Sequence, residues 1–148
     1  MKILILNGPN INFLGIREPE VYGIANYDDL CNYLMNIAIA KDINLLIKQT
    51  NSEGKIIDIL QECHFDDTDY IILNAGAYTH YSYAISDAIK AIQKPVIEVH
   101  LSNILEREDY RKKSVIQDSC VKTFMGKGFE SYKEAINYCL KEEGKDEN

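Results

Sequence analysis

The chain has 148 residues, a formal net charge of −7 and a pI near 4.9, and this length fits one domain with a single core. Because nucleic-acid binders usually carry a basic face, the acidic balance argues against a nucleic-acid partner. No apolar run approaches the roughly 18 residues that span a bilayer, and no cleavage-site pattern follows Met1, so we expect a cytoplasmic protein without a membrane partner.

Apolar runs rich in branched residues alternate along the chain with segments of helical periodicity. The runs predict strands at residues 2–6, 45–48, 70–73, 95–99 and 121–125. Apolar residues recur every three or four positions at 30–38, 56–60, 84–92 and 132–140, which predicts helices. This alternation indicates a flavodoxin-like α/β fold, a doubly wound five-stranded parallel sheet with helices on both faces. We expect one domain over residues 1–142 and a charged, disordered tail over 143–148.

Several common ligand sites of such folds lack their motifs. There is no phosphate-binding G-x-x-x-x-G-K-[ST] loop, and the only glycine pair that suggests a dinucleotide fingerprint, at Gly126 and Gly128, follows the last strand instead of the first. The three histidines have no metal-ligand spacing. The four cysteines, Cys31, Cys63, Cys120 and Cys139, show no C-x-x-C pairing. We interpret them as reduced thiols rather than disulfides, metal ligands or nucleophiles.

The connection after the first strand, residues 7–23, is the most unusual segment of the chain. Connections in compact strand–helix units are usually a few residues long, so a segment of this length is typical of a lid or a binding loop. It carries the polar residues Asn10, Asn12, Arg17, Glu18 and Tyr22. In a doubly wound sheet, ligands bind outside the carboxyl ends of the strands. Function is therefore expected in this connection and in residues 51–54, 74–80 and 100–111.

The end of the fourth predicted strand carries an acid and a histidine, Glu98 and His100. Side chains of a strand alternate between its faces, so these two residues point the same way and the carboxylate can orient the imidazole. Such a pair suits general acid–base catalysis. A partly buried structural ion pair is the other interpretation.

Residues 74–80 lead into the third predicted helix, for which Thr79 is a candidate N-cap and Gly76 permits close approach of the backbone. His80 and Asp87 are seven residues apart and are expected on nearly the same helix face, where they could touch a ligand or a neighbouring subunit, or simply be solvated.

Three arginines, Arg17, Arg107 and Arg111, are expected near the same edge of the sheet. Arginine suits an anionic substrate, although a single arginine usually marks a solvated face.

Tyr22 needs cations nearby to act as a base, because at a reference pKa of about 10 only about 0.1% of tyrosine is ionised at pH 7. Lowering that pKa by two units requires about 2.7 kcal/mol of differential stabilisation, which one or two guanidinium groups in a closed site could provide.

Three blocks of the sequence resemble the type II dehydroquinases, the 3-dehydroquinate dehydratases of the shikimate pathway. The first block reads NGPNIN at residues 7–12, LGIREP at 14–19 and YG at 22–23. The others read NAGAYTH at residues 74–80, and EVHLSN at 98–103 followed by Arg107, Glu108 and Arg111. The blocks occur in the family's order and cover nearly the whole chain. The chain departs from many members at Ala75, where they carry proline, and at Ser52, where they carry histidine.

The resemblance implies anti elimination of water from 3-dehydroquinate through an enolate, without cofactor or metal, on the pathway to chorismate and the aromatic amino acids. Tyr22, held as tyrosinate by Arg17 and Arg107, would be the base, and a water positioned by Asn10 would stabilise the enolate. His100, oriented by Glu98, would protonate the departing hydroxyl. The substrate would be bound by Asn74, His80, Leu101, Ser102 and Arg111.

The resemblance also implies that the protein is a homo-oligomer, a dodecamer built from trimers, in which Asp87 reaches a neighbouring subunit's site. Two other functions remain open at the level of the sequence. One is a noncatalytic flavodoxin-like module that binds a small anion or a partner, and the other is a different cofactor-free lyase that acts on a hydroxy-keto acid.

Overall fold

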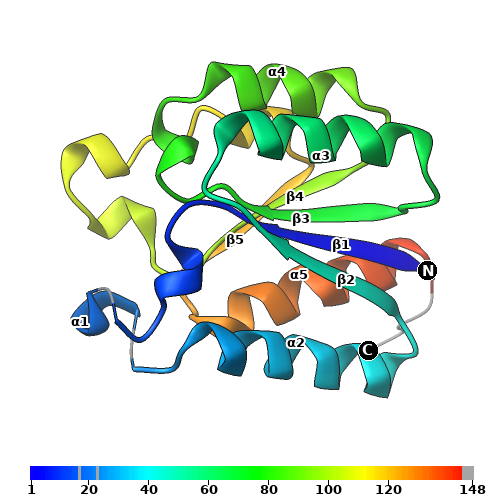
Figure 1. Cartoon of the computed structure of the whole chain (residues 1–148), viewed down its shortest axis with the longest axis horizontal. Coiled ribbons are helices and arrows are strands. Elements are labelled where there is room, and N and C mark those ends of the chain that lie inside the picture. Colours follow the sequence, from blue (N-terminus) through cyan, green and yellow to red (C-terminus); the bar gives the residue numbers. More distant parts are fainter. Residues whose placement is uncertain (17, 23, 145–148) are drawn as a thin grey trace.

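A five-stranded parallel sheet forms the centre of the computed structural model, which describes residues 1–16, 18–22 and 24–144. Its strands are β1 (Lys2–Asn7), β2 (Asn44–Gln49), β3 (Tyr70–Asn74), β4 (Val96–His100) and β5 (Lys122–Met125). They lie in the order β2-β1-β3-β4-β5, and every neighbouring pair is parallel (Figure 1). This is the flavodoxin-like arrangement that the alternating pattern predicts, and each predicted strand lies within one or two residues of its observed bounds.

Helices cover both faces of the sheet. α2 (Tyr27–Lys41) and α5 (Phe129–Glu142) lie on one face, and α3 (Glu53–Phe65) and α4 (Tyr83–Ala91) on the other (Figure 1). Side chains alternate along β1, so Ile3 and Ile5 join the apolar cluster under α2 and α5, whereas Leu4 and Leu6 join the cluster under α3 and α4. Each such side chain, once fully buried, contributes about 1.5–3 kcal/mol to stability. The two clusters hold the sheet rigidly between the helices.

The long connection after β1 contains short helical turns rather than a plain loop. A 3₁₀ helix spans Ile11–Phe13, and the four-residue helix α1 spans Pro19–Tyr22. Arg17 and the side chain of Tyr22 lie outside the described part of the structure, so their predicted roles stay predictions. Further 3₁₀ helices span Gly76–His80, Ile104–Glu106, Asp109–Arg111 and Gln117–Ser119.

The start of α4 differs from the sequence-based expectation. Ser82, not Thr79, is the N-cap, and its Oγ accepts a hydrogen bond from the Ile85 N–H at 3.1 Å. Thr79 is fully buried in the preceding 3₁₀ helix, which ends where the N–H groups of Tyr81 and Ser82 both donate to the Tyr78 carbonyl. His80 therefore precedes α4, and the prediction that His80 and Asp87 share one helix face was wrong.

The remaining predictions concern the cysteines, the C-terminal end of the chain and membrane spans. The four cysteines are free thiols, of which Cys63 and Cys139 are buried in the apolar clusters. α5 ends at Glu142, and the next residue, Glu143, accepts a hydrogen bond from the Tyr70 hydroxyl at 3.0 Å. Residues 145–148 of the expected tail lie outside the described part. Within the described part, no helix is long and apolar enough to cross a membrane.

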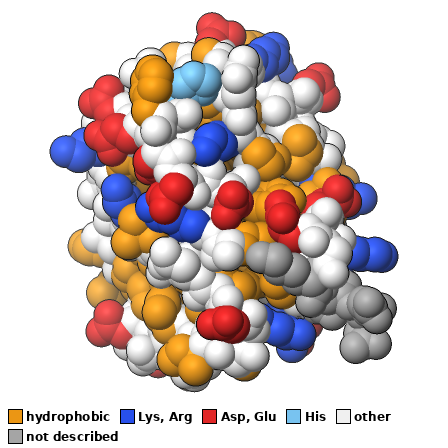
Figure 2. Space-filling model, turned by 90° about the vertical axis from the view of Figure 1, so that its right-hand side faces the viewer, with side chains coloured by type: hydrophobic (Ala, Val, Ile, Leu, Met, Phe, Trp, Pro, Cys, Tyr) orange, Lys and Arg blue, Asp and Glu red, His pale blue; other side chains and the backbone are white. Residues whose placement is uncertain are grey.

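The face at the amino ends of the strands carries acidic and basic side chains intermixed with apolar ones (Figure 2). One ion pair there joins the Lys2 ammonium to the Asp67 carboxylate at 2.7 Å. The opposite edge of the sheet, at the carboxyl ends of the strands, carries the candidate site.

Candidate active site

A pocket lies at the carboxyl ends of β1, β3 and β4, where the connections after these strands meet. Its lining includes seven of the predicted site residues, which are Asn10, Asn74, His80, His100, Leu101, Ser102 and Arg111. Arg107 and the backbone region around Pro9 and Gly76 complete much of the wall. Three strand ends converge here because β1, β3 and β4 are adjacent in the sheet, with the order reversing next to β1.

Glu98 and His100 form a buried pair, as the strand alternation predicts. The His100 Nε2 lies 2.6 Å from the Glu98 Oε2, and the two side chains are 7% and 0% exposed. An ionised carboxylate only accepts hydrogen bonds, so Nε2 carries the hydrogen and donates. The other ring nitrogen, Nδ1, is therefore the one that remains for a ligand in the pocket. A proton added to His100 would be held on this nitrogen.

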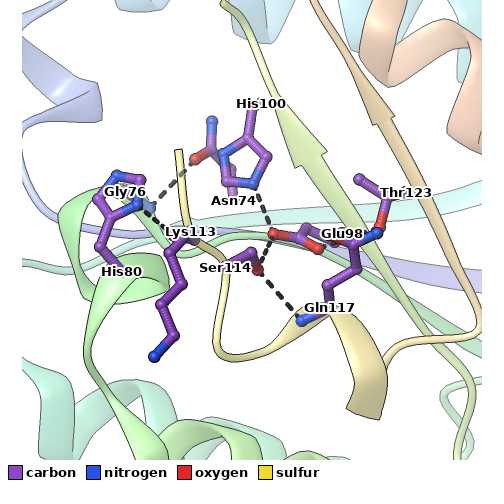
Figure 3. A network of polar contacts seen from close by, with 9 residues as sticks. All are labelled: Asn74, Gly76, His80, Glu98, His100, Lys113, Ser114, Gln117 and Thr123. Carbon is purple, nitrogen blue, oxygen red and sulfur yellow. Dashed lines mark hydrogen bonds and ion pairs between the residues drawn. The ribbon is translucent and has the colours of Figure 1, made fainter. Parts of the chain in front are cut away.

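Two hydroxyl groups hold the Glu98 carboxylate in place (Figure 3). The Ser114 Oγ donates to the Glu98 Oε2 at 2.7 Å, and the Thr123 Oγ1 donates to the Oε1 at 3.0 Å. Burial alone would raise the pKa of Glu98, but the hydrogen bonds and charge of His100, together with the two hydroxyl donors, hold that pKa below its ordinary value. Glu98 is thus an anion that keeps the imidazole in one orientation.

The sequence analysis did not identify these two hydroxyl residues. Thr123 stands opposite Glu98 in the β4–β5 register, so alternation along the two strands could have suggested it. Ser114 lies in an irregular segment between two 3₁₀ helices, where no periodic signal predicts the direction of a side chain.

His80 contacts the pocket as a neutral ring. Its Nδ1 lies 2.7 Å from the Lys113 carbonyl oxygen (Figure 3). Because a carbonyl only accepts, Nδ1 carries the hydrogen. Burial lowers the pKa of His80, the nearby positive charges of His100, Arg111 and Arg107 lower it further, and the hydrogen bond to Lys113 opposes them. At neutral pH the Nε2 of His80 is therefore an acceptor, suited to a ligand hydroxyl.

Two arginines give the pocket positive charge. The Arg107 guanidinium lies 3.4 Å from the Ser102 Oγ and 3.5 Å from the Glu18 carboxylate, with its side chain 12% exposed. It thereby links the connection after β4 to the long connection after β1. The Arg111 Nε lies 3.2 Å from the Glu108 carboxylate, and its guanidinium packs 4.9 Å from the centre of the Tyr110 ring. Paired guanidinium groups at one pocket suit an anionic ligand.

Asn10 reaches the pocket through an uncommon backbone conformation. Its φ of 67° lies in the left-handed region, which asparagine tolerates better than most residues. The Asn10 N–H donates to the Asn51 Oδ1 at 3.1 Å, and the same oxygen accepts from the Gln49 Nε2 at 3.0 Å. The Tyr78 hydroxyl donates to the Asn51 carbonyl at 2.8 Å. Asn51 therefore joins the connections after β1, β2 and β3. In the sequence, only its position after the second predicted strand points to such a role.

Among the predicted site residues whose side chains the structure describes, Asp87 lies apart from the pocket. It is exposed on α4 and is not part of the lining. Ser52, at a position where the chain departs from many dehydroquinases, is the N-cap of α3 and accepts from the Lys55 N–H at 3.2 Å. Within the residues that the structure describes, no group of three or more His, Cys, Asp and Glu residues could hold a metal ion.

The profile of a family described as Dehydroquinase class II matches residues 1–140. The chain is 52% identical over 141 residues to a 3-dehydroquinate dehydratase of Caldicellulosiruptor saccharolyticus, covering 95% of this chain and 97% of that protein. Among solved structures, a type II dehydroquinase from Butyrivibrio crossotus is similar with a TM-score of 0.92 and 48% identity, covering 94% of this chain and 97% of the other. A type II dehydroquinase from Propionibacterium acnes is similar with a TM-score of 0.90 and 36% identity, covering 95% and 96%.

Proposed function

This chain belongs to the class II dehydroquinase family, and we propose that its pocket carries out the anti elimination of water from 3-dehydroquinate through an enolate, giving 3-dehydroshikimate. The protein is a hydro-lyase, a 3-dehydroquinate dehydratase of the shikimate pathway. The reaction removes one proton next to a ketone and expels one hydroxyl group. A base and an acid on opposite sides of the substrate are enough for it, and neither step needs a cofactor.

The observation that carries the assignment of the acid is the Glu98–His100 pair at the pocket wall. Glu98 accepts from Nε2, so His100 delivers its proton from Nδ1 to the departing hydroxyl, which leaves as water. Proton transfer by a positioned side chain typically contributes about 10²–10⁴-fold in rate.

The proposed base is Tyr22, with Arg17 beside it, on the strength of the family resemblance and of their place in the long connection. One contact of the described residues brings a guanidinium group to this connection. The Arg107 guanidinium lies 3.5 Å from the carboxylate of Glu18, four residues before Tyr22. A guanidinium group close to the Tyr22 hydroxyl would favour tyrosinate over tyrosine. A water positioned by Asn10 would donate to the enolate oxygen.

The substrate's carboxylate and hydroxyl groups have complementary partners in the pocket. Arg111 and Ser102, with the Leu101 backbone, provide donors for the carboxylate, while Asn74 provides both a donor and an acceptor. His80 accepts from a substrate hydroxyl at Nε2, because its Nδ1 hydrogen is held by the Lys113 carbonyl.

We propose further that the chain works as a dodecamer of trimers, with Asp87 contributing to a neighbouring subunit's site. Asp87 is exposed on α4, and Tyr81, just before that helix, and Tyr83, its first residue, are each 60% exposed. A cytoplasmic location accords with four free thiols.

The deciding experiment mixes metal-free protein with 3-dehydroquinate at neutral pH and follows the absorbance of the enone product. We expect a rise that His100→Ala abolishes, while circular dichroism shows that this variant is folded. No rise with the folded, assembled wild-type protein would overturn the dehydratase assignment, in favour of a different lyase or a binding module.

The base is tested separately with Tyr22→Phe. This change should abolish turnover while leaving substrate binding measurable by calorimetry, because the ring stays and only the ionisable hydroxyl is lost. Turnover close to that of the wild type would remove Tyr22 from the role.

A further inference from the structure

A chain of hydrogen bonds runs beneath the pocket between elements far apart in the sequence. The Gly76 N–H donates to the Asn74 Oδ1 at 3.2 Å, and the Asn74 Nδ2 donates to the Tyr132 hydroxyl oxygen at 2.9 Å. The Tyr132 hydroxyl in turn donates to the Asn7 Oδ1 at 2.6 Å, and the Asn7 Nδ2 lies 3.4 Å from the Tyr27 hydroxyl oxygen. Every bond runs in the same direction, from Gly76 toward Tyr27.

The fold brings these groups together in a simple way. Asn7 and Asn74 end β1 and β3 and are directly paired in the parallel register. Their side chains therefore leave the sheet on the same face, the one covered by α2 and α5. Tyr132, near the start of α5, is fully buried, and its hydroxyl bonds to both amides.

The direction of the chain settles how the Asn74 amide is oriented. A backbone N–H can only donate, so the atom facing Gly76 must be the carbonyl oxygen of Asn74, and the NH₂ group must face Tyr132. Burial raises the pKa of Tyr132, so its hydroxyl keeps the proton that it donates to Asn7. One Asn74 amide hydrogen and one lone pair of its Oδ1 are left over for a ligand, and Asn74 lines the pocket.

We propose that Tyr132 is a positioning residue for the dehydratase reaction, which acts together with the Gly76 N–H to hold the Asn74 amide in one orientation toward the substrate. This inference rests on the proposed function, because it requires Asn74 to bind the substrate. Tyr132 itself touches no substrate, since α5 lies under the sheet and Tyr132 is absent from the pocket lining.

The test is Tyr132→Phe, which removes the hydroxyl and keeps the ring. The substrate loses one well-placed hydrogen bond, so KM should rise about fivefold with kcat changed less than about twofold. In an Asn74→Ala background, the same change should leave KM unaltered. Equal effects in both backgrounds, or a fall in kcat alone, would overturn the proposal.

Tyr70→Phe is the matched control. Tyr70 lies at the other end of β3, and its hydroxyl also makes one hydrogen bond, to Glu143 at 3.0 Å. It should lower the unfolding temperature without moving KM, as a purely structural hydroxyl would. If Tyr132→Phe does not fold, Asn7→Ala removes the acceptor that orients the Tyr132 hydroxyl but keeps its bond to Asn74, so a smaller rise in KM in the same direction is expected.

Crystal structures without substrate separate this inference from the proposed function. The Asn74 side chain should rotate or become disordered in Tyr132→Phe but not in Tyr70→Phe, and an unchanged Asn74 overturns the inference. If the wild-type protein fails to convert 3-dehydroquinate, the proposed function is overturned. The crystal structures still show separately whether Tyr132 holds the Asn74 side chain.

Discussion

At the scale of single residues, the chemistry of the pocket depends on which ring nitrogens carry hydrogen. The Glu98 carboxylate accepts a hydrogen bond from the Nε2–H of His100, and the Lys113 carbonyl accepts one from the Nδ1–H of His80. The two histidines therefore present opposite nitrogens to the pocket, Nδ1 from His100 and Nε2 from His80. In the proposed reaction, the His100 ring gives a proton and the His80 ring accepts a hydrogen bond.

The first prediction concerns Glu98→Gln. The amide has nearly the same shape but only one acceptor oxygen, so it cannot accept from His100, Ser114 and Thr123 together. We expect kcat to fall by about 10²–10⁴-fold, the range for loss of acid–base assistance. The matched control is Glu143→Gln, at the opposite end of the sheet, for which steady-state kinetics should give the wild-type kcat. Full activity of Glu98→Gln would contradict the proposed role of the carboxylate.

The second prediction is a loss of stability toward acid pH. The folded-state pKa of His80 lies below its ordinary value of 6.5, and that of Glu98 below its ordinary value of 4.5. In both cases the unfolded chain binds protons more readily than the folded chain. Stability therefore rises with pH between the folded-state pKa and the unfolded-state pKa of each group. The contribution of His80 is complete above about pH 6.5 and is lost as pH falls through its lowered pKa.

Unfolding temperatures at pH 7.5 and pH 5.5 test this expectation. The wild-type protein should lose more stability between the two values than His80→Gln, which has no titrating ring. If His80→Gln and the wild-type protein lose the same stability between the two pH values, His80 does not contribute to the acid sensitivity.

At the scale of elements, the pocket is built where two strand ends approach closely. The Gly8 N–H donates to the Asn74 carbonyl at 2.7 Å, just beyond β1 and β3. A Cβ on Gly8 would lie 2.8 Å from the Ala75 carbonyl oxygen, closer than real Cβ contacts. Only glycine lets the two connections meet at this distance.

The third prediction compares two glycines. Gly8→Ala forces the β1 and β3 connections apart and should destabilise the protein by about 1–3 kcal/mol, with reduced activity. Gly54→Ala, at an exposed position of α3 with nothing closer than 3.9 Å to the new Cβ, should instead stabilise it by about 0.4–1 kcal/mol. Differential scanning calorimetry measures both changes. Shifts of the same sign for the two variants would refute the argument.

At the scale of the whole molecule, the exposed side of α4 is the surface through which the proposed assembly would contribute to the proposed reaction. Asp87 lies there, outside the pocket of its own chain. If a neighbouring subunit's site needs this carboxylate, the isolated chain contains an incomplete site.

The fourth prediction is therefore that sedimentation velocity finds an assembly far larger than the 16.9 kDa chain. Asp87→Ala should lower turnover without dissociating this assembly. Asp58→Ala, at an exposed position of α3, is the control and should retain wild-type turnover. A fully active monomer would contradict the shared site.

The sequence by itself determined the layered fold and the acid–histidine pair. Periods of two and of three to four residues are local properties, and they distinguish strands from helices before any tertiary contact forms. The same period of two predicted that Glu98 and His100 share one face of β4, and the structure confirms it. Motif blocks at residues 7–23, 74–80 and 98–111 then pointed to the family that the comparisons establish.

Tertiary structure decided what depends on partners distant in the chain. Ser82 is the N-cap of α4 because a 3₁₀ helix occupies Gly76–His80 before it, which local sequence does not reveal. The His80 tautomer depends on the carbonyl of Lys113, 33 residues away. The orientation of the Asn7 amide depends on the hydroxyl of Tyr132, 125 residues away. Such contacts arise only after the sheet and helices have packed, because a side chain's hydrogen-bond partner is set by position in space and not by local periodicity.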